Sequence, residues 1–255
     1  MNNKFFLVLI CLAIITTSCR KELTFETVTT SSNELSICNN ATCPEIDIEY
    51  VQVSGTTETA QIINESIEYF VKQSMYLGEN ETGSSAENIT QAMTEFVEIY
   101  RLHSAEFPDL TAEYFVEITV LPSYNSKELL SLSCRNYLYA GGAHGNGSLQ
   151  FKNFDPKDGR ELYYEDIFDD VAAFEALAEN KFRSQQNIPT NTSINATGFR
   201  FEDGKFYLPE TFGISKEFIT LQYNAYEIAS YAAGPTVVEI PISEVKELLK
   251  IPIKD

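Results

Sequence analysis

The spacing of apolar residues changes several times along this 255-residue chain, and these changes constrain the fold more than any other feature. Segments 45–53, 113–121 and 130–139 alternate apolar and polar residues, which is typical of half-buried β-strands. Segments 58–77 and 84–108 instead carry apolar residues three or four positions apart, which predicts amphipathic helices. Strands thus come in runs separated by a few helices. We expect an α+β fold with a mainly antiparallel sheet and a few packed helices.

Local signals complete this outline. Ser84 and Glu87 have the spacing of a capping box, which predicts that the second helix begins beside them. A further helix is predicted from Asp169, because apolar residues recur at helical spacing up to Phe182. More strands are predicted by short β-prone segments at 149–154, 205–208, 218–223 and 236–240. A short helix is expected over 242–249.

The N-terminus has the pattern of an export signal. Residues Phe5 to Ile15 form an unbroken apolar run, too short for a bilayer-spanning helix of roughly 20 residues but suited to a signal peptide. The following Thr16-Thr17-Ser18-Cys19 resembles a lipobox, although Thr16 stands where that pattern prefers leucine. We expect a signal peptide over 1–18 and lipid on Cys19. Ordinary secretion and an uncleaved anchor stay open as alternatives.

The predicted location follows from that signal. The lipid on Cys19 would be the protein's sole contact with a membrane, and the domain would face the periplasm or the exterior. Residues 19–43 are rich in Thr, Ser, Asn and Glu and have no sustained periodicity. Such a composition predicts a flexible tether between the membrane and the domain.

The net charge limits the partners. The chain has 18 basic and 37 acidic residues, a net charge of −19 that becomes −20 once Lys4 is removed with the signal peptide. A surface this acidic repels phosphate backbones, and we therefore expect no nucleic acid binding. It attracts cationic partners and speeds their encounter. Solubility alone is the simpler explanation of the same charge.

Cysteine and histidine usage limits disulfides and metals. Cys38 and Cys43 flank a four-residue loop, and export would allow them to form a disulfide. Cys134 lies in an apolar strand pattern, which is typical of a buried thiol. The chain has two histidines, so we expect no zinc or other metal site, and no motif indicates a cofactor.

A glycine-dense segment, 141–147, contains the most noticeable candidate residue, His144. Glycines let a backbone approach a ligand closely, yet this segment is neither a P-loop nor a dinucleotide fingerprint. Because the sequence indicates no nucleophile or orienting partner, a structural or binding role for His144 is favoured over a general base. Tyr223, Tyr226 and Tyr231 form either a recognition patch or part of the core. The carboxylates near Asp155 are read as a turn followed by a helix start.

Several segments in a fixed order resemble a known family. They are Tyr139 to Gly145, Asn153 to Leu162, Glu165 to Phe168, Phe206 to Leu208, Tyr226 to Pro235 and Ile240 to Val245. This order is similar to that of the DUF3298 family, found in the extracytoplasmic part of the lysozyme-sensing anti-sigma factor RsiV. The preceding stretch resembles the DUF4163 or PdaC-like module. We therefore divide the chain into modules at 44–138 and 139–255, and under this resemblance we expect the two modules to pack as one unit.

The resemblance implies a compact α+β ectodomain whose best-understood relative binds lysozyme. We expect a non-enzymatic envelope lipoprotein that binds a lysozyme-like cationic protein or a cell-wall glycan such as peptidoglycan. The residues expected to contact the ligand are Tyr139, Gly141, Gly142, His144, Tyr226 and Tyr231. One alternative is an envelope hydrolase acting on peptidoglycan or another glycan, which would require His144 in a concave pocket facing a carboxylate. A structural lipoprotein without a diffusible ligand is another.

Overall fold

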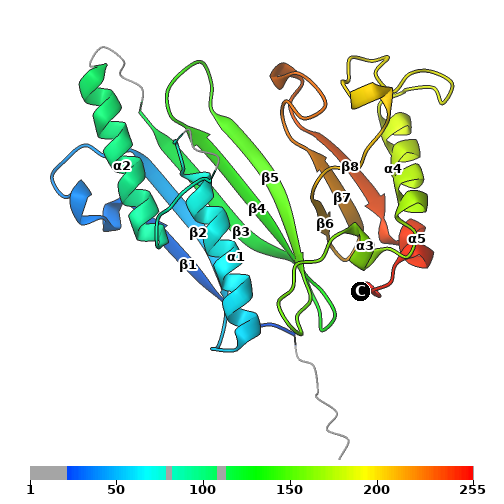
Figure 1. Ribbon diagram of the computed structural model, residues 1–255, viewed down its shortest axis with the longest axis horizontal. Helices are drawn as coiled ribbons and strands as arrows, with labels where there is room; N and C mark the ends of the chain where they lie inside the picture. The colour runs from blue at the N-terminus through cyan, green and yellow to red at the C-terminus, as the bar shows by residue number, and fades with distance from the viewer. Residues whose placement is uncertain (1–21, 79–81, 108–112, 255) are drawn as a thin grey trace, which may run out of the picture.

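The computed structural model describes residues 22–78, 82–107 and 113–254. Two sheets lie side by side, with helices packed on each (Figure 1). The first has the order β1-β2-β3-β4-β5 and the second the order β6-β7-β8. The strands of the first sheet are β1 (Phe25–Ser31), β2 (Glu45–Val53), β3 (Phe115–Asn125), β4 (Leu130–Tyr139) and β5 (Asn146–Phe154). Those of the second are β6 (Phe212–Ile214), β7 (Phe218–Tyr223) and β8 (Thr236–Pro241).

The five α-helices in the described residues are α1 (Glu58–Ser74), α2 (Ile89–Glu106), α3 (Tyr164–Ile167), α4 (Val171–Gln185) and α5 (Ile242–Val245). The β2–β3 pair is parallel, because α1 and α2 form the crossover between these strands, and every other pair is antiparallel. The protein is therefore α+β with mainly antiparallel sheet, as the sequence predicted. Among the described residues, no helix combines the length and the apolar character needed to cross a membrane.

Helices α1 and α2 cover one face of the first sheet (Figure 1). Alternation in β3 and β4 directs Ile118 and Cys134 toward the helices, where they pack with Ile63 and Phe96 in one core. The second sheet has its own core beneath α4, which buries Phe182 among several other aromatic rings. Each sheet thus buries its apolar face under helices, which is how the changes of hydrophobic period produce two layered modules.

The prediction of a flexible tether up to residue 43 is wrong for the part that the structure describes. β1 pairs with β2 along its full length, from Phe25 with Val53 to Ser31 with Asp47. This strand gives no local signal in the sequence, because its polar, Thr-rich residues show no apolar alternation, although threonine suits a strand. Its order comes from backbone pairing with β2.

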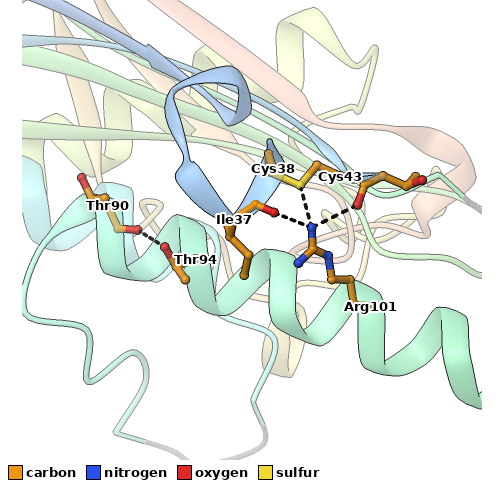
Figure 2. The surroundings of a disulfide bond; sticks show 7 residues. Ile37, Cys38, Cys43, Thr90, Thr94 and Arg101 are labelled. Carbon is orange, nitrogen blue, oxygen red and sulfur yellow. Dashed lines mark hydrogen bonds between the residues drawn. A yellow bond between two sulfur atoms is a disulfide. The ribbon is translucent and has the colours of Figure 1, made fainter. Parts of the chain in front are cut away.

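A disulfide follows this strand. Cys38 and Cys43 are bonded to each other, with their Cα atoms 5.6 Å apart. Arg101 on α2 donates from its guanidinium to the carbonyl of Ile37 at 2.7 Å and contacts the Cys43 sulfur at 3.5 Å (Figure 2). The disulfide loop is therefore attached to α2, which is a second reason why this segment is not a free tether.

Three local predictions also differ from the structure. The side chain that caps α2 is Asn88, which accepts from the Gln91 amide at 2.9 Å, and not Ser84. Residues 205–208 do not form a strand, whereas 212–214 form β6. Strand β5 belongs to the first sheet, although the division at residue 139 had assigned it to the second module. Short segments such as β6 depend on distant partners that local patterns do not reveal.

Side-chain hydrogen bonds, not a continuous backbone ladder, join the two sheets at β5. Asn224 accepts from the Leu149 amide at 2.9 Å and donates to the Leu149 carbonyl at 3.0 Å. Thr211 accepts from the Phe151 amide, and Asn153 donates to the Phe212 carbonyl. These bonds satisfy backbone groups of Leu149 and Phe151 on the outer edge of β5 and the Phe212 carbonyl of β6, and we call this junction the seam.

The seam predicts a stability effect. Replacing Asn224 by alanine leaves the amide and carbonyl of Leu149 without their partners, so we expect Asn224→Ala to lower the free energy of unfolding by about 1–3 kcal/mol. Urea denaturation measures this loss. The exposed Asn33 provides the matched control, because Asn33→Ala should change stability by less than about 0.5 kcal/mol. Equal losses for the two variants would contradict a structural role for the seam.

Candidate functional site

A groove of about 830 Å³ lies between the first sheet and the β7–β8 loop. Its floor is the sheet face opposite α1 and α2, which we call the open face. There Glu117 and Thr119 of β3, Arg135 of β4 and Leu149 of β5 line the groove. The opposite wall includes Gln222 and residues 231–235. The seam holds this wall in place, because Asn224 binds the backbone of Leu149 at the floor.

Aromatic rings continue the open face beyond the groove. Phe115 stacks on Tyr137 with ring centroids 5.3 Å apart and an interplanar angle of 14°, and it contacts Tyr139 at 5.9 Å. We call these three residues the aromatic platform. Tyr137 also lines the groove and is 39% exposed. A Cβ atom at Gly145 or Gly147 would lie 2.5 or 3.0 Å from its side chain, so these glycines make room for the ring.

A second aromatic group lies at the rim of the groove. The rings of His144 and Tyr231 stack with centroids 3.7 Å apart, and Tyr226 contacts Tyr231 at 5.4 Å. The Tyr231 hydroxyl donates to the Gly145 carbonyl at 2.8 Å. We call His144, Tyr226 and Tyr231 the rim cluster. It joins the β4–β5 loop to the β7–β8 loop, which lie at the same end of the molecule (Figure 1).

The six residues predicted to contact a ligand thus fall into two sets. His144, Tyr226 and Tyr231 come together in the rim cluster, and Tyr231 lines the groove. The others shape the loop beside it: Tyr139 donates to the Gly142 carbonyl at 3.1 Å, and Gly141 and Gly142 have φ values of 86° and 90°. A positive φ explains glycine at both positions. Cys19, the predicted lipidation site, lies outside the described residues.

His144 has no acid–base partner in the described part of the chain. Its ring is exposed, and its Nδ1 lies 3.0 Å from the Gly145 carbonyl. No carboxylate of a described residue makes a hydrogen bond or ion pair with it. A general base needs such an orienting group. Likewise, no group of three or more metal-ligating side chains is assembled among the described residues.

Arg135 and Tyr137 were not among the predicted site residues, although the sequence carries a signal for them. Both alternate with Cys134 and Leu138, so they must lie on the face opposite the core. Cys134 itself is a buried free thiol whose pKa burial raises to about 12. It therefore stays protonated and is a core residue behind the open face. What the alternation does not reveal is the wall that turns this face into a groove.

The backbone of Tyr226 supports a second prediction. This residue has φ 73°, a conformation that is unfavourable for side chains with a Cβ, and its ring is 64% exposed. Both Tyr226→Gly and Tyr226→Ala remove the ring, but glycine alone relieves the backbone. We expect the glycine variant to be more stable by about 0.5–1 kcal/mol in urea denaturation.

The exposed Tyr69 on α1 is the control for that pair. In a helix the order should reverse, with Tyr69→Ala more stable than Tyr69→Gly by about 1 kcal/mol. If the alanine variant is the more stable one at Tyr226 as well as at Tyr69, Tyr226 is not strained. A strained, exposed aromatic residue is not explained by core packing, so its presence at the rim is consistent with a role in recognition.

Comparisons with known proteins agree with this two-module arrangement. A family described as a protein of unknown function, DUF3298, matches residues 165–243, and a family described as deacetylase PdaC matches residues 37–147. A curated relative, the peptidoglycan-N-acetylmuramic acid deacetylase PdaC of Bacillus subtilis, is 21% identical over 206 residues. That match covers 77% of this chain but only 42% of the relative, so the chain spans less than half of its length.

Two solved structures of DUF3298 proteins are similar in fold. One from Bacteroides fragilis has a TM-score of 0.67 and 24% identity, covering 90% of this chain and 94% of that one. One from Pseudomonas aeruginosa has a TM-score of 0.59 and 17% identity, covering 91% and 96%. At these identities the likeness concerns the fold alone. From the family matches, the chain carries a PdaC-like module followed by a DUF3298 domain.

Proposed function

We propose that this protein is a non-enzymatic binding protein of the bacterial cell envelope, and that its groove holds a cell-wall glycan. The observation that carries this proposal is the groove bordered by exposed aromatic rings and by amide side chains. The signal-peptide pattern and Cys19 support the envelope location, with the lipid as the contact to the membrane. The ligand would then be an extracytoplasmic molecule.

The chemistry of the groove suits a sugar chain. Sugar rings combine apolar C–H faces with hydroxyl edges, so they pack against aromatic rings while their hydroxyls bind polar groups. Tyr137 and Tyr231 provide the aromatic surface, and Gln222, whose carboxamide makes no hydrogen bond to a described residue, provides a polar group. The curated relative is named for peptidoglycan, which makes that polymer the first glycan to test here.

Binding is favoured over hydrolysis by the surroundings of His144. The hydrolase alternative needs this residue in a pocket opposite a carboxylate. Instead its ring is exposed and stacks on Tyr231 in the rim cluster, which suits a contact surface. The rim cluster would extend the groove toward the same ligand.

A lysozyme-like cationic protein is a second candidate ligand, favoured by a different observation. Next to the groove, a hollow of about 280 Å³ is lined by Glu34, Asp47, Glu49 and Glu117. None of these carboxylates forms an ion pair within the described residues. A cationic protein could neutralise them, and such binding should weaken steeply as salt screens the charges.

Retention by insoluble peptidoglycan tests the proposal and separates the two ligands. We expect residues 20–255 to sediment with peptidoglycan at low and at high salt, because stacking and neutral hydrogen bonds are weakly screened. Tyr137→Ala should weaken binding roughly five- to tenfold. The same substitution at Tyr69, on the helix-covered side, should leave binding unchanged. If both variants are retained as well as the unchanged protein, the groove is not the binding site.

A parallel capture with lysozyme identifies the alternative. Salt-sensitive capture of lysozyme without retention by peptidoglycan would transfer the function to a cationic protein ligand. Capture by neither probe would overturn the proposed function as a whole.

A further inference from the structure

Arg135 stands at the centre of the groove floor. Its cross-strand neighbours are Thr119 on β3 and Leu149 on β5. It is the one cationic side chain among the described residues that line the groove. The seam fixes the opposite wall directly beside it, since Asn224 binds both backbone groups of Leu149. These hydrogen bonds therefore fix the position of the wall relative to the Arg135 guanidinium.

This guanidinium has no partner within the described part of the chain. No hydrogen bond or ion pair of Arg135 is present there, and its side chain is exposed to the groove. Some cations of this acidic protein form ion pairs, as Lys152 does with Glu161, and others, such as the exposed Arg200, form none within the described residues. What distinguishes Arg135 is that it is unpaired and lines the groove.

Gln222 provides an uncommitted polar side chain on the wall opposite Arg135. It lines the groove from β7 and is only 8% exposed. Its carboxamide makes no hydrogen bond to any described residue. The amide atoms of Gln222 are not enclosed, so water solvates them in the free protein and a polar group of a ligand can replace that water.

We propose that the groove selects glycans that carry a carboxylate, and that Arg135 binds that carboxylate while Gln222 binds an adjacent polar group of the same sugar. This inference rests on the proposed glycan-binding function. A guanidinium matches a carboxylate with two parallel hydrogen bonds, which adds specificity to charge. A neutral sugar would leave Arg135 without its counter-charge.

Glu117 determines the orientation of such a ligand. It is the acidic residue that lines the groove, and it lies across from Tyr137 in the β3–β4 register. A carboxylate placed near Glu117 would be repelled, so the acidic group of the ligand points toward Arg135 and neutral hydroxyl or amide groups point toward Glu117. Tyr137 neighbours both charges, across from Glu117 and two residues along β4 from Arg135, so it is placed to contact the sugar ring.

Calorimetry with matched sugars tests this inference on residues 20–255. The probes are the disaccharide of N-acetylglucosamine and N-acetylmuramic acid, and the same disaccharide with its lactyl carboxylate converted to an amide. We expect the acid form to bind roughly tenfold more tightly. Arg135→Gln should abolish this preference while retaining affinity for the amide form, and Arg135→Lys should keep part of it.

Arg200→Gln is the control, since it removes the same charge from an exposed arginine that does not line the groove, and it should leave the preference intact. Equal affinities of the unchanged protein for both probes would overturn the selectivity and leave glycan binding standing. If neither probe binds, the proposed selectivity is also overturned. The peptidoglycan sedimentation then decides separately whether the proposed function survives. A preference that persists in Arg135→Gln would remove Arg135 from the site.

Discussion

The hydrogen bonds of the seam are the interaction on which the rest of the structure depends. An edge strand such as β5 presents unpaired amides and carbonyls, which are open to pairing with other chains. Here Asn224 and Thr211 occupy alternate positions along that edge. Because the partners are side chains, the second sheet stays beside the first without merging into one long ladder. This offset leaves the open face uncovered and holds the β7–β8 loop over it, so the groove is a consequence of the seam.

Close approach of rings to glycines gives the site its shape. Tyr137 lies against β5 because Gly145 and Gly147 have no side chain in its way, and Gly145 also accepts from the Tyr231 hydroxyl. The aromatic platform and the rim cluster therefore share one short loop. A change in that loop would alter both, which links the glycine-dense segment to recognition through packing, with no need for a chemical role of its backbone.

The sequence predicted elements whose signal is local and missed those whose order comes from distant partners. Helix α4 was predicted from Asp169 because its apolar residues recur at helical spacing, and in the structure Asp170 caps a helix that begins at Val171. By contrast, β1 was read as a tether, since its order comes from pairing with β2. The site follows the same division. Tyr226 and Tyr231 were candidates by residue type, whereas Arg135 needed the strand register and the wall from β7.

The charge distribution connects the groove with the rest of the surface. A protein with a net charge of −19 has a surplus of carboxylates, and an arginine on its surface gains from pairing with one of them. Along the open face, however, Thr119 and Leu149 flank Arg135, while the nearest acidic residue of the floor, Glu117, stands one cross-strand pair away and makes no ion pair with it. The surrounding negative charge raises the cost of bringing in an anion from a distance, but a Debye length of about 8 Å confines that cost to close range in physiological salt. Within the groove, attraction by the nearby Arg135 guanidinium then outweighs repulsion by distant carboxylates. An acidic surface and a preference for a carboxylated sugar are therefore compatible in one molecule.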